Sequence, residues 1–203
     1  MDFTKVKQNL ERLGYVVSCF ATKEEAAAYL DRQIDGTTVG FGGSATLNEM
    51  GLYELLAAHN QVTWHWRMPT GMTDKEVRMA ERAAAVYVSS MNGLAETGEI
   101  VNIDNTGNRV ADIEYGHERV YLVAGSNKLA PDYEGALWHA RNVASPRNAQ
   151  RLGCKTPCAV KADKCYNCQS PGRICRILSV LWEMPKASGA VYEVILVDEA
   201  LGY

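Results

Sequence analysis

The chain has 203 residues, of which 47% are hydrophobic and 22% are charged, and its formal net charge is −3. This length suits one domain, and this composition excludes a disordered or a fibrous chain. Because a nucleic-acid-binding surface normally shows a basic excess, the mild negative charge argues against nucleic acid as the ligand.

The first half of the chain predicts alternating helices and strands. Apolar residues at three- and four-residue steps indicate the helices, two of which follow the expected N-cap residues Thr22 and Thr73, and short apolar runs indicate the strands. Gly14 is the expected end of the first helix. The helices are expected over residues 3–13, 23–34, 47–56 and 74–84. The strands are expected over residues 15–20, 37–41, 62–66 and 85–89.

The second half departs from this rhythm. A stretch rich in Gly, Asn, Asp and Thr over residues 94–110 predicts a hairpin or a long loop. A helix is expected over residues 131–152, which Pro146 should break or kink after Ser145, with two shorter helices as the alternative. Further strands are expected over residues 99–103, 119–124 and 191–197.

The alternation of strands and helices predicts an α/β fold. Such chains form a mainly parallel, Rossmann-like sheet with helices on both faces and right-handed connections. We expect a single domain over residues 1–203, with an irregular, cysteine-rich, metal-binding segment over residues 154–176 before the last strand.

The N-terminus and the cysteines bear on the compartment. The N-terminal segment lacks the apolar core and cleavage site of a signal peptide, and no apolar run approaches the roughly 18 residues that span a bilayer. We therefore expect a cytoplasmic protein with no membrane insertion. In a reducing compartment the six cysteines are expected to be metal ligands or reactive thiols before disulfides.

Five of the six cysteines gather between Cys154 and Cys175. Cys165 and Cys168 form a C-x-x-C pair, which places two thiolates on one turn, and Cys158 and Cys175 flank the pair at equal spacing. Four thiolates suit either zinc or a [4Fe–4S] cluster. Because zinc sites usually contain two such pairs, we favour the iron–sulfur cluster. A redox-active dithiol is the alternative.

A glycine loop follows the strand over residues 37–41. Its glycines, Gly42 and Gly43, let the backbone approach an anion, and the hydroxyls of Ser44 and Thr46 can bind that anion at a helix N-terminus. A carboxylate or a phosphate would suit this loop. The alternative is an ordinary tight turn capped by Ser44.

Two further loops are candidates for the same crevice. The first is Glu96-Thr97-Gly98, and the second, after a strong strand, contains Asn127 and Lys128, whose ammonium group could neutralise an anion. Loops at the carboxyl ends of parallel strands share one crevice, so these side chains are expected to converge. No catalytic residue is identified, although Glu49, Glu96 and Asp104 stay open as acid–base groups. His65 is predicted as a core residue or a pocket wall.

Motifs along nearly the whole chain resemble the lactate-utilization domain (LUD) family, in a short form with cysteines near its C-terminus. The motifs are Gly42-Gly43-Ser44 with Thr46 and Glu49, Glu96-Thr97-Gly98, Thr106-Gly107-Asn108-Arg109, Ala124-Gly125-Ser126-Asn127-Lys128, Asn148-Ala149, Lys155-Thr156-Pro157-Cys158 and Cys165-x-x-Cys168-x-Ser170-Pro171-x-Arg173-Ile174-Cys175. Cys154 lies outside this pattern, so the resemblance implies Cys158, Cys165, Cys168 and Cys175 as the metal ligands. It also implies a fold similar to ribose-5-phosphate isomerase A and the CoA transferases.

The resemblance further implies a link to the oxidation of lactate to pyruvate. We therefore expect a metal- or iron–sulfur-binding accessory protein of lactate or other organic-acid oxidation, with a crevice for a carboxylate or phosphate. The alternative is a self-sufficient isomerase or acyl-transfer enzyme with a structural zinc site, and a third reading is a ligand sensor without turnover. The expected partners are a small anion, other proteins of an organic-acid oxidation system, and a second copy of the chain in a homodimer.

Overall fold

The computed structural model describes residues 2–186 and 189–203. Its main element is a six-stranded sheet with the order β1-β10-β7-β4-β2-β3, in which every neighbouring pair is parallel. The strands are β1 (Val16–Phe20), β2 (Thr38–Phe41), β3 (Gln61–Trp64), β4 (Val86–Ser90), β7 (Arg119–Gly125) and β10 (Val191–Val197). The carboxyl ends of all six strands therefore meet at one edge.

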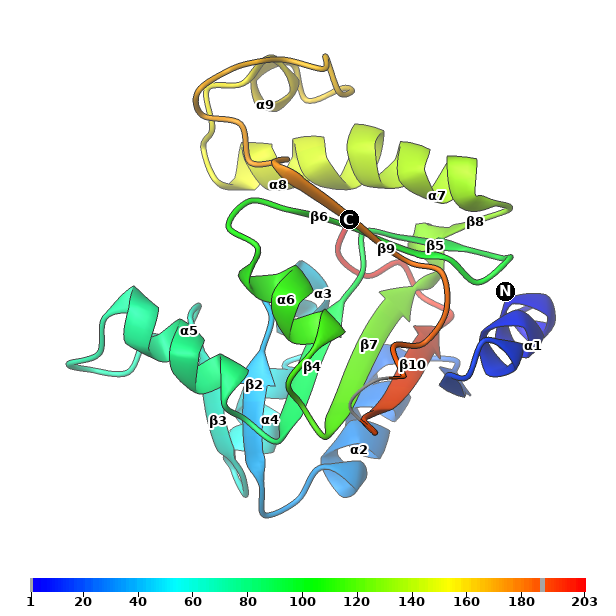
Figure 1. Ribbon diagram of the computed structural model, residues 1–203, viewed down its shortest axis with the longest axis vertical. Coiled ribbons are helices and arrows are strands. Elements are labelled where there is room, and N and C mark those ends of the chain that lie inside the picture. Colours follow the sequence, from blue (N-terminus) through cyan, green and yellow to red (C-terminus); the bar gives the residue numbers. More distant parts are fainter. Residues whose placement is uncertain (1, 187–188) are drawn as a thin grey trace.

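Helices cover both faces of this sheet (Figure 1). Alternate strand residues point to opposite faces, so Leu122 packs into one core and its neighbours Tyr121 and Val123 into the other. One face carries α2 (Lys23–Gln33), α3 (Ala45–Glu49) and α4 (Leu52–Ala57), and the other carries α1 (Thr4–Arg12), α5 (Asp74–Arg82) and α6 (Asn108–Glu114). The predicted mainly parallel α/β fold is confirmed.

Local signals in the sequence set several helix ends. The Thr22 hydroxyl accepts a hydrogen bond from the backbone N–H of Glu25 at 3.2 Å, as expected of an N-cap. Thr73 and Glu76 form a reciprocal capping box at the start of α5. Gly14 ends α1 with a φ of 95°, a left-handed conformation that favours glycine.

A second, smaller sheet lies beyond the carboxyl edge of the large one (Figure 1). Its order is β8-β5-β6-β9, with β5 (Gly93–Ala95), β6 (Ile100–Asp104), β8 (Leu129–Ala130) and β9 (Ile177–Leu181). β5 and β6 form the predicted hairpin. The polar stretch also contains the helix α6, which the sequence did not predict. Gly107 precedes this helix with a φ of 88°, and an Asp104 carboxylate oxygen accepts from the Val110 N–H in its first turn.

The predicted helix over residues 131–152 covers the small sheet. It comprises α7 (Tyr133–His139), a π-helical turn (Ala140–Ala144) and α8 (Ser145–Arg151). The π-helical turn interrupts the regular α-helix before Pro146 is reached. Pro146 itself occupies the first turn of α8, where its missing N–H is tolerated. The Ser145 hydroxyl donates to the Ala140 carbonyl oxygen at 2.8 Å and closes the turn.

The segment over residues 154–176 connects α8 to β9. As predicted it is mostly irregular, apart from the short helix α9 (Pro157–Lys161). In the part of the chain that the structure describes, no helix has the length and apolar character needed to cross a membrane.

Candidate functional site

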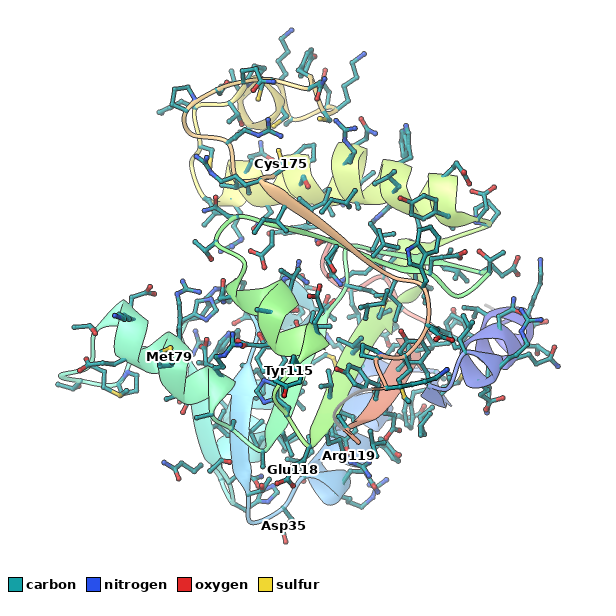
Figure 2. The ribbon with its side chains drawn as sticks, in the orientation of Figure 1. Asp35, Met79, Tyr115, Glu118, Arg119 and Cys175 are labelled. Atoms are coloured by element: carbon teal, nitrogen blue, oxygen red, sulfur yellow. The ribbon has the colours of Figure 1, made fainter. Side chains whose placement is uncertain are left out.

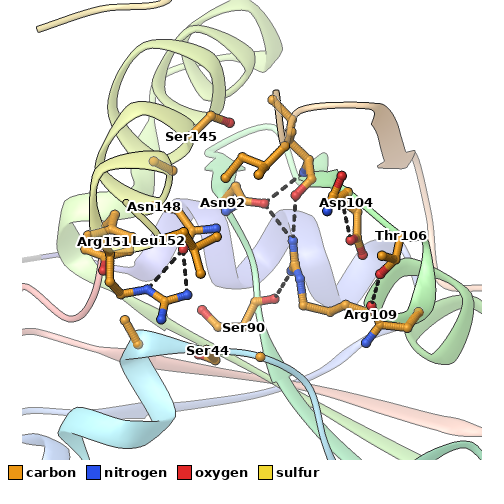
Figure 3. A pocket seen from close by; sticks show the side chains of 18 of the residues that line it. Ser44, Ser90, Asn92, Asp104, Thr106, Arg109, Ser145, Asn148, Arg151 and Leu152 are labelled. Carbon is orange, nitrogen blue, oxygen red and sulfur yellow. Dashed lines mark hydrogen bonds between the residues drawn. The ribbon is translucent and has the colours of Figure 1, made fainter. Parts of the chain in front are cut away.

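A cavity of about 440 Å³ opens at the carboxyl edge of the large sheet. Residues that follow β2, β3, β4 and β7 line it together with residues of α6 and of α8, and the α6 and α8 residues face each other across the cavity (Figure 3). Ligands of open parallel sheets bind at this edge. The lining includes Thr46, His65, Ser90, Arg109, Lys128 and Arg151.

Lys128 is the buried cation of this cavity and is only 3% exposed. Its Nζ donates to the Thr46 hydroxyl at 2.7 Å and to the Ser90 hydroxyl at 2.6 Å. No carboxylate among the described residues lies within ion-pair distance of it. Because an ammonium group has three N–H donors, one donor is available to a ligand in the cavity.

Burial sets the charge state of Lys128. Burial, with a smaller contribution from the positive charge of Arg109, lowers the pKa of the ammonium group to about 7, although the carboxylate of Glu49 opposes the shift. A bound anion would favour the charged form and raise this pKa. Near neutral pH, Lys128 is therefore only partly protonated, and an anion bound beside it would increase the protonated fraction.

Arg109 organises the side of the cavity formed by α6. Its guanidinium donates to the Asn92 side-chain oxygen and to the Ser90 carbonyl oxygen (Figure 3). It also donates to the Asn102 side-chain oxygen and the Ile103 carbonyl oxygen, and the four distances are 2.5–3.0 Å. Burial lowers the pKa of this group from its ordinary value. Since protein acceptors already occupy four of its N–H donors, Arg109 acts chiefly as a positioning residue.

Arg151 faces the cavity from the opposite side (Figure 3). It donates twice to the Asn148 side-chain oxygen, at 2.9 and 3.1 Å, and its guanidinium carbon lies 4.5 Å from the Trp66 ring centroid. Arg78, by contrast, is paired with Asp74 at 2.8 Å. Arg151 is thus the second cation available to an anion in the cavity.

The glycine loop lies between these cations. The Ser44 hydroxyl accepts from the Leu47 N–H at 3.2 Å, which is the capping role weighed as the alternative to anion binding. A Cβ atom on Gly43 would lie 3.0 Å from His65 Nε2, so a larger residue would displace that ring. A Cβ on Gly42 would lie 2.5 Å from the Ser89 hydroxyl, outside the cavity lining.

The other predicted ligand-binding residues lie away from the cavity lining. Glu96-Thr97-Gly98 forms the β5–β6 turn, where the Glu96 carboxylate pairs with Lys5 of α1 at 2.7 Å. Glu49 accepts from the Gly202 N–H at 2.8 Å, and the Asn127 side-chain oxygen accepts from the Leu201 N–H at 3.0 Å. Glu49 and Asn127 thus fix the C-terminal residues beside the site. Of the predicted set, Gly43, Ser44, Thr46 and Lys128 line the cavity.

Sequence reasoning did not assign Arg151 to the site, and it gave His65 only as a core residue or a pocket wall. Arg151 lies three residues after Asn148, so the two share a helix face, and the position of Asn148 in a family motif was an available signal. His65 directly follows β3 at the carboxyl edge, the same placement that singled out Lys128.

The four predicted metal ligands lie half-buried, as free thiols, on the irregular segment above α8, where Figure 2 labels Cys175. The Arg141 guanidinium donates to Cys165 Sγ at 3.7 Å, and that of Arg173 donates to Cys175 Sγ at 3.5 Å. Hydrogen bonds from Ser170, together with the charge of Arg173, lower the pKa of the Cys168 thiol. These surroundings favour the thiolate form of Cys168.

The donor set fits a metal centre in kind, since thiolates bind both zinc and iron–sulfur clusters. In residues 2–186 and 189–203, however, no three His, Cys, Asp or Glu side chains are arranged to hold one ion. Binding would therefore require the segment to close around the metal.

Comparison with known proteins agrees with this architecture. A model of the LUD domain matches residues 3–196. No curated protein matches the chain. The crystal structure of a DUF162 family protein from Deinococcus radiodurans is similar over 97% of this chain and 99% of that chain, with a TM-score of 0.54 and 11% sequence identity. At this identity the likeness demonstrates a common fold.

Proposed function

The chain belongs to the LUD domain family, which is associated with lactate utilization, and from that premise we propose that it binds a small organic-acid anion beside Lys128. In this proposal it acts as an accessory protein of lactate or related organic-acid oxidation, together with other proteins of that system. The ligand is a carboxylate, with phosphate as the competing anion.

The buried ammonium group of Lys128 is the observation that supports this proposal. A buried charge costs free energy unless a partner compensates it, and here two neutral hydroxyls are its partners. An anion in the cavity would supply the missing negative charge. Arg151 and the Asn148 amide, on the opposite side, would supply further donors.

Calorimetric titration at pH 7 with lactate, pyruvate and inorganic phosphate tests the proposal. Lys128→Met keeps an unbranched side chain and removes the charge, so we expect it to weaken binding at least about 30-fold. Lys75→Met, on the exposed side of α5, is the matched control and should bind as the unaltered protein does. Equal binding by the Lys128 variant, or no binding of any of the three anions, would contradict the proposal.

We also propose that Cys158, Cys165, Cys168 and Cys175 hold a metal centre, an iron–sulfur cluster in preference to zinc. The C-x-x-C pair and the guanidinium groups beside the sulfurs support it. A bound cluster would supply electron transfer, whereas zinc would only cross-link the segment. The arginines would stabilise the thiolates in both cases.

Metal analysis of protein purified without oxygen tests the second proposal. We expect iron and sulfide in the unaltered protein and in a Cys19→Ser control, and neither in Cys165→Ser/Cys168→Ser. Stoichiometric zinc in colourless protein would favour the alternative, a self-sufficient isomerase or acyl-transfer enzyme with a structural zinc site. Protein with neither metal would overturn the metal centre.

A further inference from the structure

A histidine and a buried glutamate form a pair at the edge of the cavity. His65 Nδ1 lies 2.8 Å from a carboxylate oxygen of Glu81, and the backbone N–H of His65 donates to the same oxygen at 2.5 Å. The Glu81 side chain is fully buried and that of His65 is 11% exposed. His65 is thus the side chain that connects a buried carboxylate to the cavity.

The carboxylate determines which ring nitrogen has the proton. An ionised carboxylate only accepts hydrogen bonds, so Nδ1 must donate to Glu81. In a neutral imidazole the other nitrogen, Nε2, then has a lone pair and acts as an acceptor. Glu81 is therefore a positioning residue for the ring and its tautomer.

Nε2 of His65 is directed at the glycine loop. It lies 3.0 Å from the place where a Cβ of Gly43 would be, and both residues line the cavity. No residue in the described part of the chain forms a hydrogen bond with Nε2. Lys128 reaches the same loop through the Thr46 hydroxyl, three residues after Gly43. Lys128 and His65 therefore line one cavity, in which Nε2 is an unused acceptor.

The charged groups around the ring leave this acceptor available. Glu81 binds Nδ1, and Arg78, on the same helix, is paired with Asp74. Trp66 also borders the loop, with its Nε1 3.2 Å from the Gly43 Cβ position. None of these groups occupies Nε2.

We propose that His65 Nε2 accepts a hydrogen bond from a hydroxyl group of the ligand. The cavity then prefers a carboxylate with a hydroxyl on the neighbouring carbon over the corresponding keto acid or unsubstituted acid. A keto oxygen cannot donate to Nε2, and its lone pairs face that of the ring. The inference rests on the proposed function, since Lys128 must first hold the carboxylate.

Titration with lactate, propionate and pyruvate tests the inference. One hydrogen bond predicts that lactate binds about 3- to 10-fold more tightly than propionate, while pyruvate has no such advantage. His65→Leu should abolish the difference between lactate and propionate. His59→Leu, at an exposed histidine outside the cavity lining, is the matched control and should keep the preference.

A second measurement needs no altered residue in the cavity. In protein labelled with ¹⁵N-histidine, we expect Nε2 of His65 to have the chemical shift of an unprotonated nitrogen. This chemical shift should change when lactate but not propionate is added.

A third experiment changes the positioning residue. Glu81→Gln can donate an amide N–H to Nδ1 and move the ring proton to Nε2, which should reduce or reverse the preference for lactate over pyruvate.

The outcomes separate this inference from the proposed function. Equal binding of lactate and propionate by the unaltered protein, or a protonated Nε2, would overturn the role of His65 and leave the anion site intact. Absence of binding for all three acids would overturn both.

Discussion

The cavity and the cysteine segment hold their polar groups in different ways. In the cavity, Lys128 and Arg109 lie near the ends of regular elements, and acceptors from β4, β6 and α3 fix them. In the segment, Arg173 bonds mainly to neighbours within the same irregular stretch, the carbonyl oxygens of Cys168 and Cys175. The fold itself preorganises the cavity, whereas the segment depends on local hydrogen bonds.

The two regions also differ in charge. The segment over residues 154–176 contains five basic residues and one acidic residue, although the whole chain has a net charge of −3. The basic residues are Lys155, Lys161, Lys164, Arg173 and Arg176, and the acidic one is Asp163. Such an excess suits thiolates, whose negative charge it offsets.

The largest expected difference between the two regions is in the free energy of unfolding that is lost when an arginine is replaced. Arg109→Ala removes four hydrogen bonds to buried or half-buried acceptors, so we expect a loss of about 3 to 5 kcal/mol in the free energy of unfolding. Arg173→Ala, whose acceptors lie within the segment, should cost about 1 kcal/mol or less. Urea denaturation of both variants measures this, with Arg109→Lys as a milder substitution if alanine prevents folding. Equal losses would mean that the segment is as integral to the fold as the cavity.

The second difference is a dependence on pH. The pKa of Lys128, about 7 when folded, lies below the usual 10.5, so between these values the unfolded chain binds more protons than the folded one. Stability should therefore rise with pH across this window, by at most about 1.4 kcal/mol per pH unit. Urea denaturation at pH 7 and pH 9 should show this rise in the unaltered protein and not in Lys128→Met. Parallel pH profiles of the two proteins would contradict an ionisable, buried Lys128.

Much of the fold could be predicted because local signals determine it. The caps at Thr22 and Thr73 and the alternation of strands and helices specified the elements and the parallel sheet. The strand order could not be predicted, since β10, the last strand, pairs with β1 and β7, and local periodicity contains no information about distant partners. The small sheet was missed for the same reason, because its β9 follows the cysteine segment.

The site was partly predictable on one rule. Loops at the carboxyl ends of parallel strands converge, and Gly43, Thr46 and Lys128, which this rule singled out, line one cavity. It misplaced Glu96, because the strand before that residue belongs to the small sheet and its turn packs on α1. Which sheet a short strand joins depends on tertiary contacts that the sequence pattern does not contain.

A third difference, smaller than these, concerns two glycines. Gly43→Ala would bring a methyl group within 3.0 Å of His65 Nε2 and 3.2 Å of Trp66 Nε1, so both rings must shift by a few tenths of an ångström. We expect about 1 kcal/mol less stability and weaker lactate binding. Gly172→Ala in the segment has no atom within 4 Å to displace and should change neither quantity. Thermal unfolding and calorimetry check the pair, and a tight-binding Gly43 variant would argue against the proposed position of the ligand.

The smallest expected effect is on the stability of the α/β body when the proposed metal site is removed. Cys165→Ser/Cys168→Ser should leave the free energy of unfolding within about 0.5 kcal/mol, because neither cysteine belongs to a hydrophobic core. Limited proteolysis should nevertheless cut the variant faster within residues 154–176, where the lost metal no longer cross-links the chain. Cooperative unfolding of the whole domain on substitution or chelation would instead mean that the metal contributes folding free energy to the body, as a structural zinc site does. Because the segment leads directly into β9, the small sheet is the element through which such coupling would act.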